Sequence, residues 1–438
     1  MSKVRKVHVS EGLGGYYFDD LLAIKAGAGR DGFFYVGTPR VPGQRMVRQP
    51  GESISIMLEL DSGEVGFGDA VAIQYSGVVG RDPVLIASEY SPHVGSYIAP
   101  VLEGRELSSL RDISAELEQI TDENGQQLHT GLRYGASQAV LHALSLVQRR
   151  TMAEVVADEY GSAVSDVPVP VLAQSGDDRH SGADKMILKR VPAITQGLFN
   201  SIDKVGAKGE VLLGYVEWLR DRVLKHGGEG YEPVFHLDVY GMLGRIFDGD
   251  MQAVADYVSM LAAAAEPFRL RLEAPVDEGT RDGTIEKMVE LRQAIRDRQC
   301  EAEICADDWC NTLTDVRAFA EAGAADMIQI KAPDLGSITS CAEAVCVCRA
   351  NGVKAFLGGT CNGTDQSSRV TANLAMAMRA DLIYNKPGMG VDEGLMIVVN
   401  EMNRVLALSA SRSKGDVGVS APTLSAHAST KEVSGAST

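Results

Sequence analysis

Four apolar runs, each ending in a charged residue, decide the fold: Val234-Phe235-His236-Leu237-Asp238, Leu270-Arg271-Leu272-Glu273, Ala302-Glu303-Ile304-Cys305-Ala306-Asp307 and Ala325-Asp326-Met327-Ile328-Gln329-Ile330-Lys331. Each run has the length of a buried β-strand, and successive runs lie about one strand–helix unit apart. The ends of parallel strands meet on one face of a barrel. Three acids and a lysine there describe a metal site with a base beside it.

The same rhythm continues on both sides of these runs. We expect strands one and two at 169–173 and 186–188, strands seven and eight at 355–357 and 382–384, and helices at 209–225, 251–265, 284–298 and 340–350. The four runs are strands three to six. Eight strands alternating with helices predict an α/β protein with a (β/α)₈ barrel, in which sites lie at the C-terminal strand ends.

The first part of the chain lacks this rhythm. Residues 54–60 alternate like a strand, and a hairpin turn at 61–63 leads into a second strand at 64–70. A helical pattern follows at 132–156. We therefore expect an α+β domain at 1–160, a barrel domain at 161–410, and a disordered tail at 411–438, which is rich in small and polar residues.

Composition limits the function classes. The chain has 438 residues and a formal net charge of −17, which argues against binding to nucleic acid or to an anionic membrane surface. Neither a signal peptide nor an apolar stretch of membrane-spanning length is present. We expect a cytoplasmic enzyme with a small-molecule substrate.

Asp238, Glu273 and Asp307 offer only oxygen ligands, which suit Mg²⁺ or Mn²⁺ better than zinc. A single strand-end acid usually caps a helix or faces solvent, but three in consecutive units favour a metal site. The neighbouring acids Asp308, Asp277 and Glu278 leave the assignment open by a position or so.

Lys331 is the candidate base. Most lysines at strand ends lie on the surface, but Gln329 precedes Lys331 by two residues, so both side chains leave the same face of the strand. A buried lysine near a cation has a lowered pKa, which suits a general base. The glutamine offers amide donors to a carboxylate without adding charge.

At these residues the chain resembles the methylaspartate ammonia-lyases of the enolase superfamily, over roughly residues 1–408. The blocks that carry the resemblance are 74–77 with 80–83, 173–178, 236–241, 307–312, 329–336, 358–362, 386–394 and 400–408. The resemblance implies an enolase-type modified (β/α)₈ barrel with an N-terminal α+β capping domain, and a homodimer. It also implies reversible elimination of ammonia from L-threo-3-methylaspartate, an amino dicarboxylate, to give mesaconate.

The resemblance further implies Mg²⁺ held by Asp238, Glu273 and Asp307, usually with K⁺ as a second cation. Lys331 is implied as the base for C3. The implied substrate contacts are Gln174, Gln329, Thr360 and Cys361, with Gln74 close by.

The chain departs from this family at Gln196, where an ungapped alignment of 184–200 has a histidine in the family. That histidine lies opposite the lysine, helps to stabilise the intermediate, and serves the other C3 epimer. Glutamine donates a hydrogen bond but is no base near neutral pH. The superfamily's acid-sugar and muconate branches carry Lys-x-Lys on strand two, where we place Lys185 and Lys189, four residues apart.

Three other interpretations remain. The first is a related lyase for another 3-substituted aspartate, which the change at Gln196 favours. The second is a barrel aldolase that uses Lys331 as a Schiff base, and the third is an inactive barrel that serves as a binding protein. The complete set of three acids and a lysine disfavours the third.

Overall fold

The computed structural model describes residues 2–413. Eight parallel strands close into one barrel: β6 (Val171–Leu172), β7 (Ala193–Gln196), β8 (Val234–Asp238), β9 (Leu270–Glu273), β10 (Glu303–Ala306), β11 (Met327–Ile330), β12 (Lys354–Leu357) and β13 (Leu382–Tyr384). Neighbours in the barrel follow the order of the chain, and β13 pairs with β6 to close the ring. The predicted (β/α)₈ barrel is confirmed.

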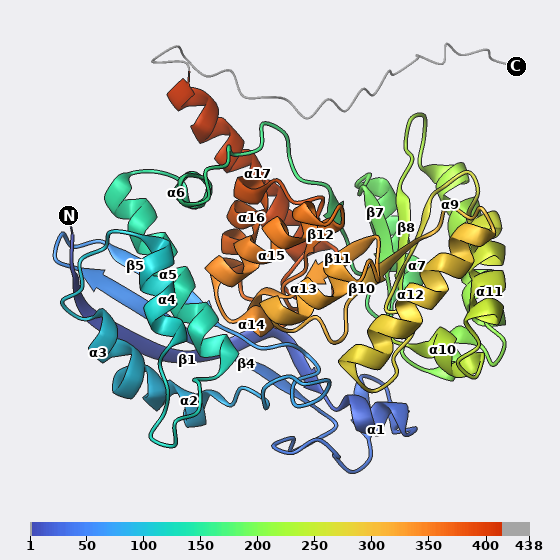
Figure 1. The fold of residues 1–438 in the computed structure, drawn as a ribbon, viewed down its shortest axis with the longest axis horizontal. Helices are drawn as coiled ribbons and strands as arrows, with labels where there is room; N and C mark the ends of the chain where they lie inside the picture. Colours follow the sequence, from blue (N-terminus) through green and yellow to red (C-terminus); the bar gives the residue numbers. More distant parts are fainter. Residues whose placement is uncertain (1, 414–438) are drawn as a thin grey trace, which may run out of the picture.

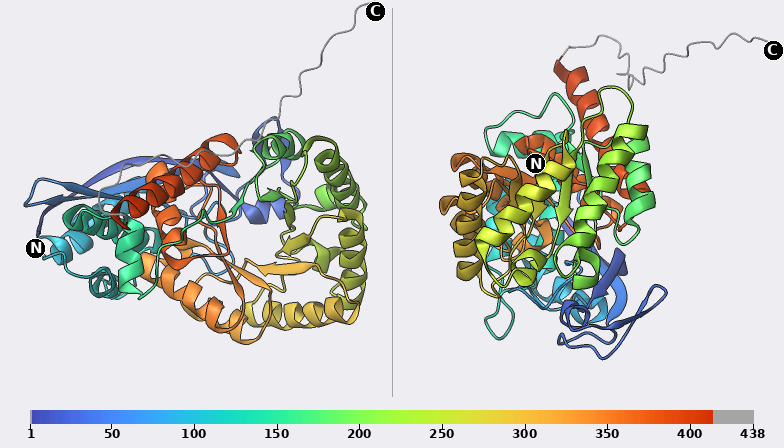
Figure 2. Two further views of the ribbon diagram at one scale, coloured as in Figure 1. Left: turned by 90° about the horizontal axis from the view of Figure 1, so that it is seen from above. Right: turned by 90° about the vertical axis from the view of Figure 1, so that its right-hand side faces the viewer.

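Helices cover the outside of the barrel (Figure 2). They are α7 (Arg179–Leu188), α8 (Ile202–Val205), α9 (Glu210–His226), α10 (Met242–Ile246), α11 (Met251–Ala265), α12 (Arg281–Asp297), α13 (Leu313–Glu321), α14 (Ala332–Leu335), α15 (Ile338–Ala350), α16 (Asp365–Met378) and α17 (Asp392–Ser413). Local sequence fixes several helix starts, since Thr312 and Thr364 form capping boxes at α13 and α16.

The prediction for strand two was wrong. Residues 186–188 end helix α7, and the second strand is β7. Ala183, Met186 and Ile187 have the spacing of one buried helix face, whereas Ile194 and Thr195 are β-branched and fully buried.

This error also misplaced two lysines. Lys185 lies on α7 and Lys189 caps its C-terminus, and both form ion pairs with Asp392 outside the barrel. The true second strand, Ala193–Gln196, contains no lysine. The absence of a Lys-x-Lys pair therefore still holds, but on a different strand from the one predicted.

The N-terminal part forms the capping domain, beside the barrel in Figure 1. Its antiparallel sheet has the order β1 (Val4–Asp19), β4 (Arg48–Leu60) and β5 (Val65–Ala70), and the predicted hairpin joins β4 to β5. The remaining elements are α1 (Leu21–Lys25), β2 (Gly29–Asp31), β3 (Phe34–Val36), α2 (Ala87–His93), a π-helical turn (Val94–Ile98), α3 (Ala99–Leu102), α4 (Leu110–Glu118), α5 (Thr130–Gln148) and α6 (Met152–Glu159).

Helix α5 packs directly on this sheet. A Cβ atom at Gly68 would lie 2.1 Å from the carbonyl oxygen of Gly135, so neither strand nor helix tolerates a side chain there. The other end of β1 reaches the barrel, where the Gly15 N–H donates to the carbonyl of Gly363 in the loop after β12 (3.1 Å). The capping domain thus touches the C-terminal end of the barrel.

Residues 411–413, which were predicted to belong to a disordered tail at 411–438, complete helix α17. Residues 414–438 lie outside the described part of the chain. Within residues 2–413, no helix has both the length and the apolar character needed to cross a membrane.

Candidate active site

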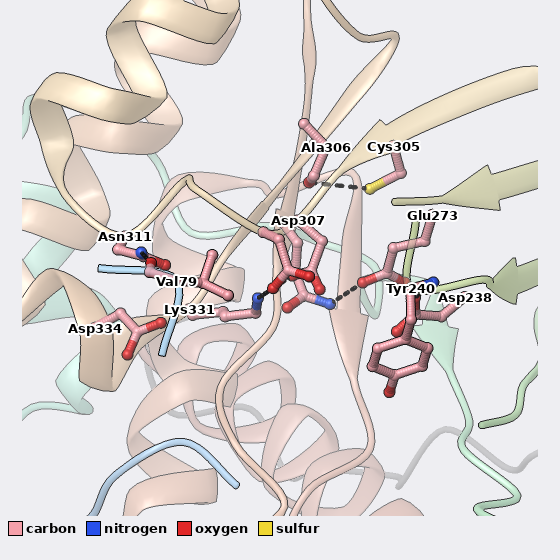
Figure 3. Close-up of polar contacts among 12 residues, drawn as sticks. Val79, Asp238, Tyr240, Glu273, Cys305, Ala306, Asp307, Asn311, Lys331 and Asp334 are labelled. Atoms are coloured by element: carbon pink, nitrogen blue, oxygen red, sulfur yellow. Dashed lines mark hydrogen bonds and ion pairs between the residues drawn. The ribbon is translucent and has the colours of Figure 1, made fainter. Parts of the chain in front are cut away.

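The three predicted metal acids converge at the C-terminal strand ends. Asp238 and Glu273 are register partners on β8 and β9, and Asp307 directly follows β10. All three are buried, and one oxygen of each lies within 4.8 Å of one from each of the others. Figure 3 shows Glu273 and Asp238 together, with Asp307 facing them and Lys331 on the other side of Asp307.

The surroundings of these three acids disfavour their ionised form. Burial raises the pKa of Asp238 well above its usual range, and the nearby acids Glu273 and Asp307 raise it further. Burial likewise raises the pKa of Glu273 and of Asp307 to about 7, although Lys331 acts in the opposite direction on both. Three converging carboxylates with raised pKa values lack sufficient positive charge, and a divalent cation would supply it. The donor set therefore fits Mg²⁺.

Lys331 lies at the end of β11 and forms an ion pair with Asp307. Its Nζ is also 3.9 Å from Oδ1 of Asp308. Burial and the charge of Arg81 lower the pKa of Lys331, but Asp307, Asp308 and Asp334 outweigh them and leave it raised. The lowered pKa predicted for Lys331 assumes a cation near the lysine, whereas in the protein alone the acids dominate.

Two of the neighbouring acids that the sequence left as alternatives, Asp308 and Asp277, have other partners. Arg81 of the capping domain donates to Asp308 (3.0 Å) and to Asp334 (2.9 Å). Although burial opposes it, Arg81 lowers the pKa of Asp308 to about 2. Asp277 accepts a hydrogen bond from the indole of Trp309 (3.0 Å). Neither acid belongs to the converging group.

Two glutamines hold the acids from opposite sides. Gln329 donates to Oε1 of Glu273 (2.5 Å), and the amide of Gln196 lies 3.3 Å from Asp238 and 3.4 Å from Glu273. Gly358 makes room for Gln329, because a Cβ atom there would lie 2.7 Å from the glutamine Cγ. The carbonyl oxygen of Gln196 is buried and has no hydrogen-bond partner among the described residues.

Glu273 is also oriented from inside the barrel. His236, two residues before Asp238, is fully buried and lies 2.8 Å from Oε2 of Glu273 through Nε2. Burial lowers the pKa of His236 well below its usual range, so the ring is neutral and donates this hydrogen bond. His236 therefore serves as a buried support of the acid.

The predicted substrate contacts line the same cavity as Lys331: Gln74, Gln174, Gln329, Thr360 and Cys361. Thr360 donates to the carbonyl of Ala72 (3.0 Å), and the Cys361 thiol donates to the amide oxygen of Gln74 (3.3 Å). These two contacts join the loop after β12 to the capping domain.

Gln74 is held in one orientation. Its amide nitrogen donates to Asp19 (2.7 Å), and Asp19 in turn accepts two hydrogen bonds of 2.7 Å from the buried guanidinium of Arg48. A carboxylate only accepts hydrogen bonds, so the amide oxygen of Gln74 is the atom left toward Cys361 and the cavity. The capping domain thus contributes an acceptor to the cavity.

Four further residues line the cavity and were not predicted from the sequence, namely Arg81, Tyr240, Tyr384 and Lys386. Lys386 lies two residues beyond β13, where the rule that singled out the strand-end acids also applies. From the sequence, Lys386 was placed only in the block 386–394 that carries the family resemblance, with no role of its own. Arg81 had no local signal, because its partners lie more than two hundred residues away along the chain.

The chain combines a capping domain with a closed parallel barrel that carries three convergent acids and a lysine at its strand ends. The muconate lactonizing enzyme of Pseudomonas fluorescens shares this fold, with a TM-score of 0.61 at 17% identity over 91% of this chain and 89% of that one. At this identity the likeness concerns the fold alone.

Closer relatives identify the family. The family models for the N-terminus and the C-terminus of methylaspartate ammonia-lyase match residues 2–161 and 163–411. Methylaspartate ammonia-lyase of Clostridium tetanomorphum is 49% identical over 412 residues, which cover 94% of this chain and 100% of the relative. The chain belongs to the methylaspartate ammonia-lyase family.

Solved structures agree. The magnesium complex of β-methylaspartase from Clostridium tetanomorphum has a TM-score of 0.88 at 49% identity and covers 94% of this chain and 100% of its own. The Citrobacter amalonaticus methylaspartate ammonia-lyase, solved with (2S,3S)-3-methylaspartic acid, has a TM-score of 0.91 at 42% identity and covers 93% and 100%.

Proposed function

We propose that this protein eliminates ammonia from L-threo-3-methylaspartate to give mesaconate, and that it also catalyses the reverse addition. The observation that carries the proposal is the placement of buried Lys331 against three convergent acids in a single cavity. Relatives that share 43–49% of their sequence with this chain are named for the same reaction. The Citrobacter relative was solved with the (2S,3S) diastereomer, which is the L-threo form.

Asp238, Glu273 and Asp307 would hold Mg²⁺, the metal of the solved Clostridium complex. When bound, Mg²⁺ supplies positive charge beside the substrate carboxylate next to C3, where negative charge builds up as the proton leaves. The side-chain amides of Gln329 and Gln196 reach the same group of acids, so they would place donors near that carboxylate.

Lys331, in its neutral form, would accept the proton from C3. The electron pair of the broken C–H bond moves toward the adjacent carboxylate, and ammonia then leaves from C2 with the electron pair of the C–N bond. Lys331 needs its ammonium proton removed before each turnover, and the acids around it hold that proton in the protein alone. Neutralising those acids is therefore part of activating the base.

Gln74, Gln174, Thr360 and Cys361 would position the rest of the substrate. All four line the cavity, from the capping domain and from the loops after β6 and β12. The amide oxygen of Gln74, which is buried and faces the cavity, is suited to the substrate's ammonium group, and the amide NH₂ of Gln174 is suited to a carboxylate. The capping domain would also exclude water from the reacting carbon.

Gln196 would limit the enzyme to the threo epimer, because it lies beside the acids and offers no base on that side. We expect the L-erythro epimer to react on the order of 100-fold more slowly than the threo epimer, the contribution of one general base. In Gln196→His the erythro rate should rise while the threo rate changes little. Comparable kcat/KM values for both epimers in the wild type would contradict this role.

A related lyase for another 3-substituted aspartate is the second candidate, and Gln196 again favours it. Steady-state assays with 3-methyl-, 3-ethyl- and unsubstituted aspartate separate the two, since the main proposal predicts the highest kcat/KM for the methyl compound. A Schiff-base mechanism predicts trapping by borohydride and no sensitivity to EDTA, whereas our proposal predicts the reverse. A binding protein without catalysis has no support from the family.

By the same resemblance we propose K⁺ as a second cation, Mn²⁺ as a substitute for Mg²⁺, a homodimer, and a cytoplasmic location. Light scattering after gel filtration tests the dimer, and assays in sodium or potassium salts test the cation.

An absorbance assay tests the main proposal directly. Mesaconate absorbs in the ultraviolet and methylaspartate does not, so turnover appears as rising absorbance. We expect it with Mg²⁺ and not after removal of the metal with EDTA, with recovery when Mg²⁺ is returned. Equal rates with and without the metal, or no turnover with it, would contradict the proposal.

A further inference from the structure

Lys386 differs from the other buried cations of the molecule. Five lysine and arginine side chains are buried in residues 2–413, and four of them pair with a carboxylate: Lys331 with Asp307, Arg48 with Asp19, Arg271 with Glu303, and Arg81 with Asp308 and Asp334. Lys386, 6% exposed, forms no ion pair with any described residue. Burying an unpaired charge is costly, so such a group calls for a partner from elsewhere.

The contacts that Lys386 does make leave its charge unbalanced. Its Nζ donates one hydrogen bond, to the amide oxygen of Gln174 (2.8 Å), and lies 3.8 Å from the centre of the Tyr384 ring. An ammonium has three N–H donors, and neither an amide nor a ring supplies a negative charge. The described residues therefore leave donors of Lys386 unused, and Lys386 lines the same cavity as Lys331.

The position of Lys386 in the barrel suits a second recognition point. Lys386 follows β13, which is four strands from β9 in either direction around the eight-stranded ring. Glu273, at the end of β9, belongs to the acidic group. The cavity thus has the metal acids on one side and an unpaired cation on the other, with Thr360 and Cys361 on the wall between them.

We propose that Lys386 binds the second carboxylate of the substrate, the one attached to the amine-bearing carbon, and so makes the site selective for dicarboxylates. This inference rests on the proposed function, in which the carboxylate next to C3 faces the metal acids. A four-carbon diacid held there presents its other carboxylate across the cavity. Lys386 also fixes the amide of Gln174, because an ammonium can only donate, which leaves the Gln174 NH₂ group free to donate to the same carboxylate.

The pKa of Lys386 agrees with an unpaired state. Burial lowers the pKa of Lys386 to about 8, even though Cys361 and the acids act to raise it. A bound carboxylate would raise this pKa again and keep the side chain charged throughout turnover.

The test compares two substrates that differ by one charge: L-threo-3-methylaspartate and its 1-carboxamide, in which the carboxylate at the amine-bearing carbon is a neutral amide. The wild type should prefer the diacid in kcat/KM on the order of 100-fold, as expected for one buried charge pair. Lys386→Met should lose most of this preference, chiefly through a higher KM for the diacid. Lys386→Arg should keep a preference for the diacid.

A purely structural role gives a different pattern. If Lys386 only supports Gln174, Lys386→Met slows both compounds by the same factor, the preference is unchanged, and the inference is overturned. Lys354→Met, which removes a lysine that pairs with Glu303 at the opposite end of the barrel, is the matched control and should leave the preference intact. Lys386→Gln replaces Lys386→Met if the latter fails to fold.

Binding separates this inference from the proposed function. Titration of the protein with mesaconate measures binding without turnover. The comparison compound is the mesaconate monoamide in which the amide replaces the carboxylate on the carbon that carries the amine in methylaspartate. The wild type should bind the diacid more tightly, and Lys386→Met should bind both alike. Equal affinities in the wild type would overturn the role of Lys386 even if turnover is observed, whereas absence of turnover with a preserved binding preference would refute only the proposed reaction.

Discussion

Strand β10 carries a carboxylate at each end, and the two have opposite surroundings. Glu303, at its start, accepts two hydrogen bonds from Arg271 (2.8 and 2.5 Å) and pairs with Lys354. Although burial opposes it, these cations lower the pKa of Glu303. Asp307, just past its end, has a pKa raised to about 7 by burial, although Lys331 is its ion partner.

The difference separates stability from function along one strand. At the start of the strand the chain supplies the positive charge itself, so the ion pairs stabilise the barrel when the protein is empty. At the other end it gathers three acids and leaves part of their charge for a ligand to neutralise. Binding sites commonly sacrifice stability in this way. The predictions that follow disturb one end of the barrel at a time.

The largest effect is expected for Lys331→Ala, which removes the base. The value of kcat should fall about 10³-fold, within the range of general base catalysis. Lys331→Arg is the matched control, because arginine keeps the positive charge beside Asp307 but stays protonated. It should be nearly as inactive when mesaconate formation is followed at saturating Mg²⁺. Appreciable activity in Lys331→Arg would show that charge, not proton transfer, is what Lys331 provides.

Asp307→Asn should affect activity and stability in opposite directions. Loss of one metal ligand should lower kcat/KM at least 100-fold at a fixed Mg²⁺ concentration. Without metal, the variant should be more stable than the wild type at pH 8 by on the order of 1 kcal/mol, because a buried carboxylate with a raised pKa opposes folding when ionised. Urea unfolding without Mg²⁺ measures this. A less stable metal-free variant would mean that the pair with Lys331 outweighs the repulsion.

Glu303→Gln should do the reverse and destabilise the protein by about 2 kcal/mol while kcat/KM stays unchanged, since it breaks half-buried ion pairs with Arg271 and Lys354 far from the cavity. The pH dependence of this contribution to the free energy of unfolding has a definite sign. A carboxylate with a lowered pKa stabilises the folded protein at pH values above its pKa in the unfolded chain, and that stabilisation is lost as the pH falls through its pKa in the folded protein. The difference between wild type and variant in urea should therefore shrink below about pH 4. A constant difference would contradict the pairing.

Most of the fold and the site could be predicted because each strand end is marked in the local sequence, by an apolar run that stops at a charged residue. The runs ending at Asp238 and Glu273 are β8 and β9 residue for residue, and the barrel closure places those ends together. The prediction of the second strand was wrong because Met186 and Ile187 form an apolar cluster that is too short to distinguish a helix from a strand.

Other features depend on contacts that no local pattern carries. The pairing of Arg81 with Asp308, which decides that Asp307 and not Asp308 joins the acidic group, comes from the capping domain. The lack of a partner for Lys386 is a property of the whole packed interior. The raised pKa of Lys331 likewise follows from acids on other elements.

Calorimetric titration of the wild type with Mg²⁺ tests the central claim most directly, namely that the acids at the C-terminal end of the barrel are left for a cation. Between pH 6 and 7, in buffers with different ionisation enthalpies, we predict one Mg²⁺ per chain and release of on the order of one proton, because metal binding deprotonates its ligands. Asp307→Asn should lose most of the binding and of the proton release. Binding without proton release in this pH range, or no binding, would contradict the account.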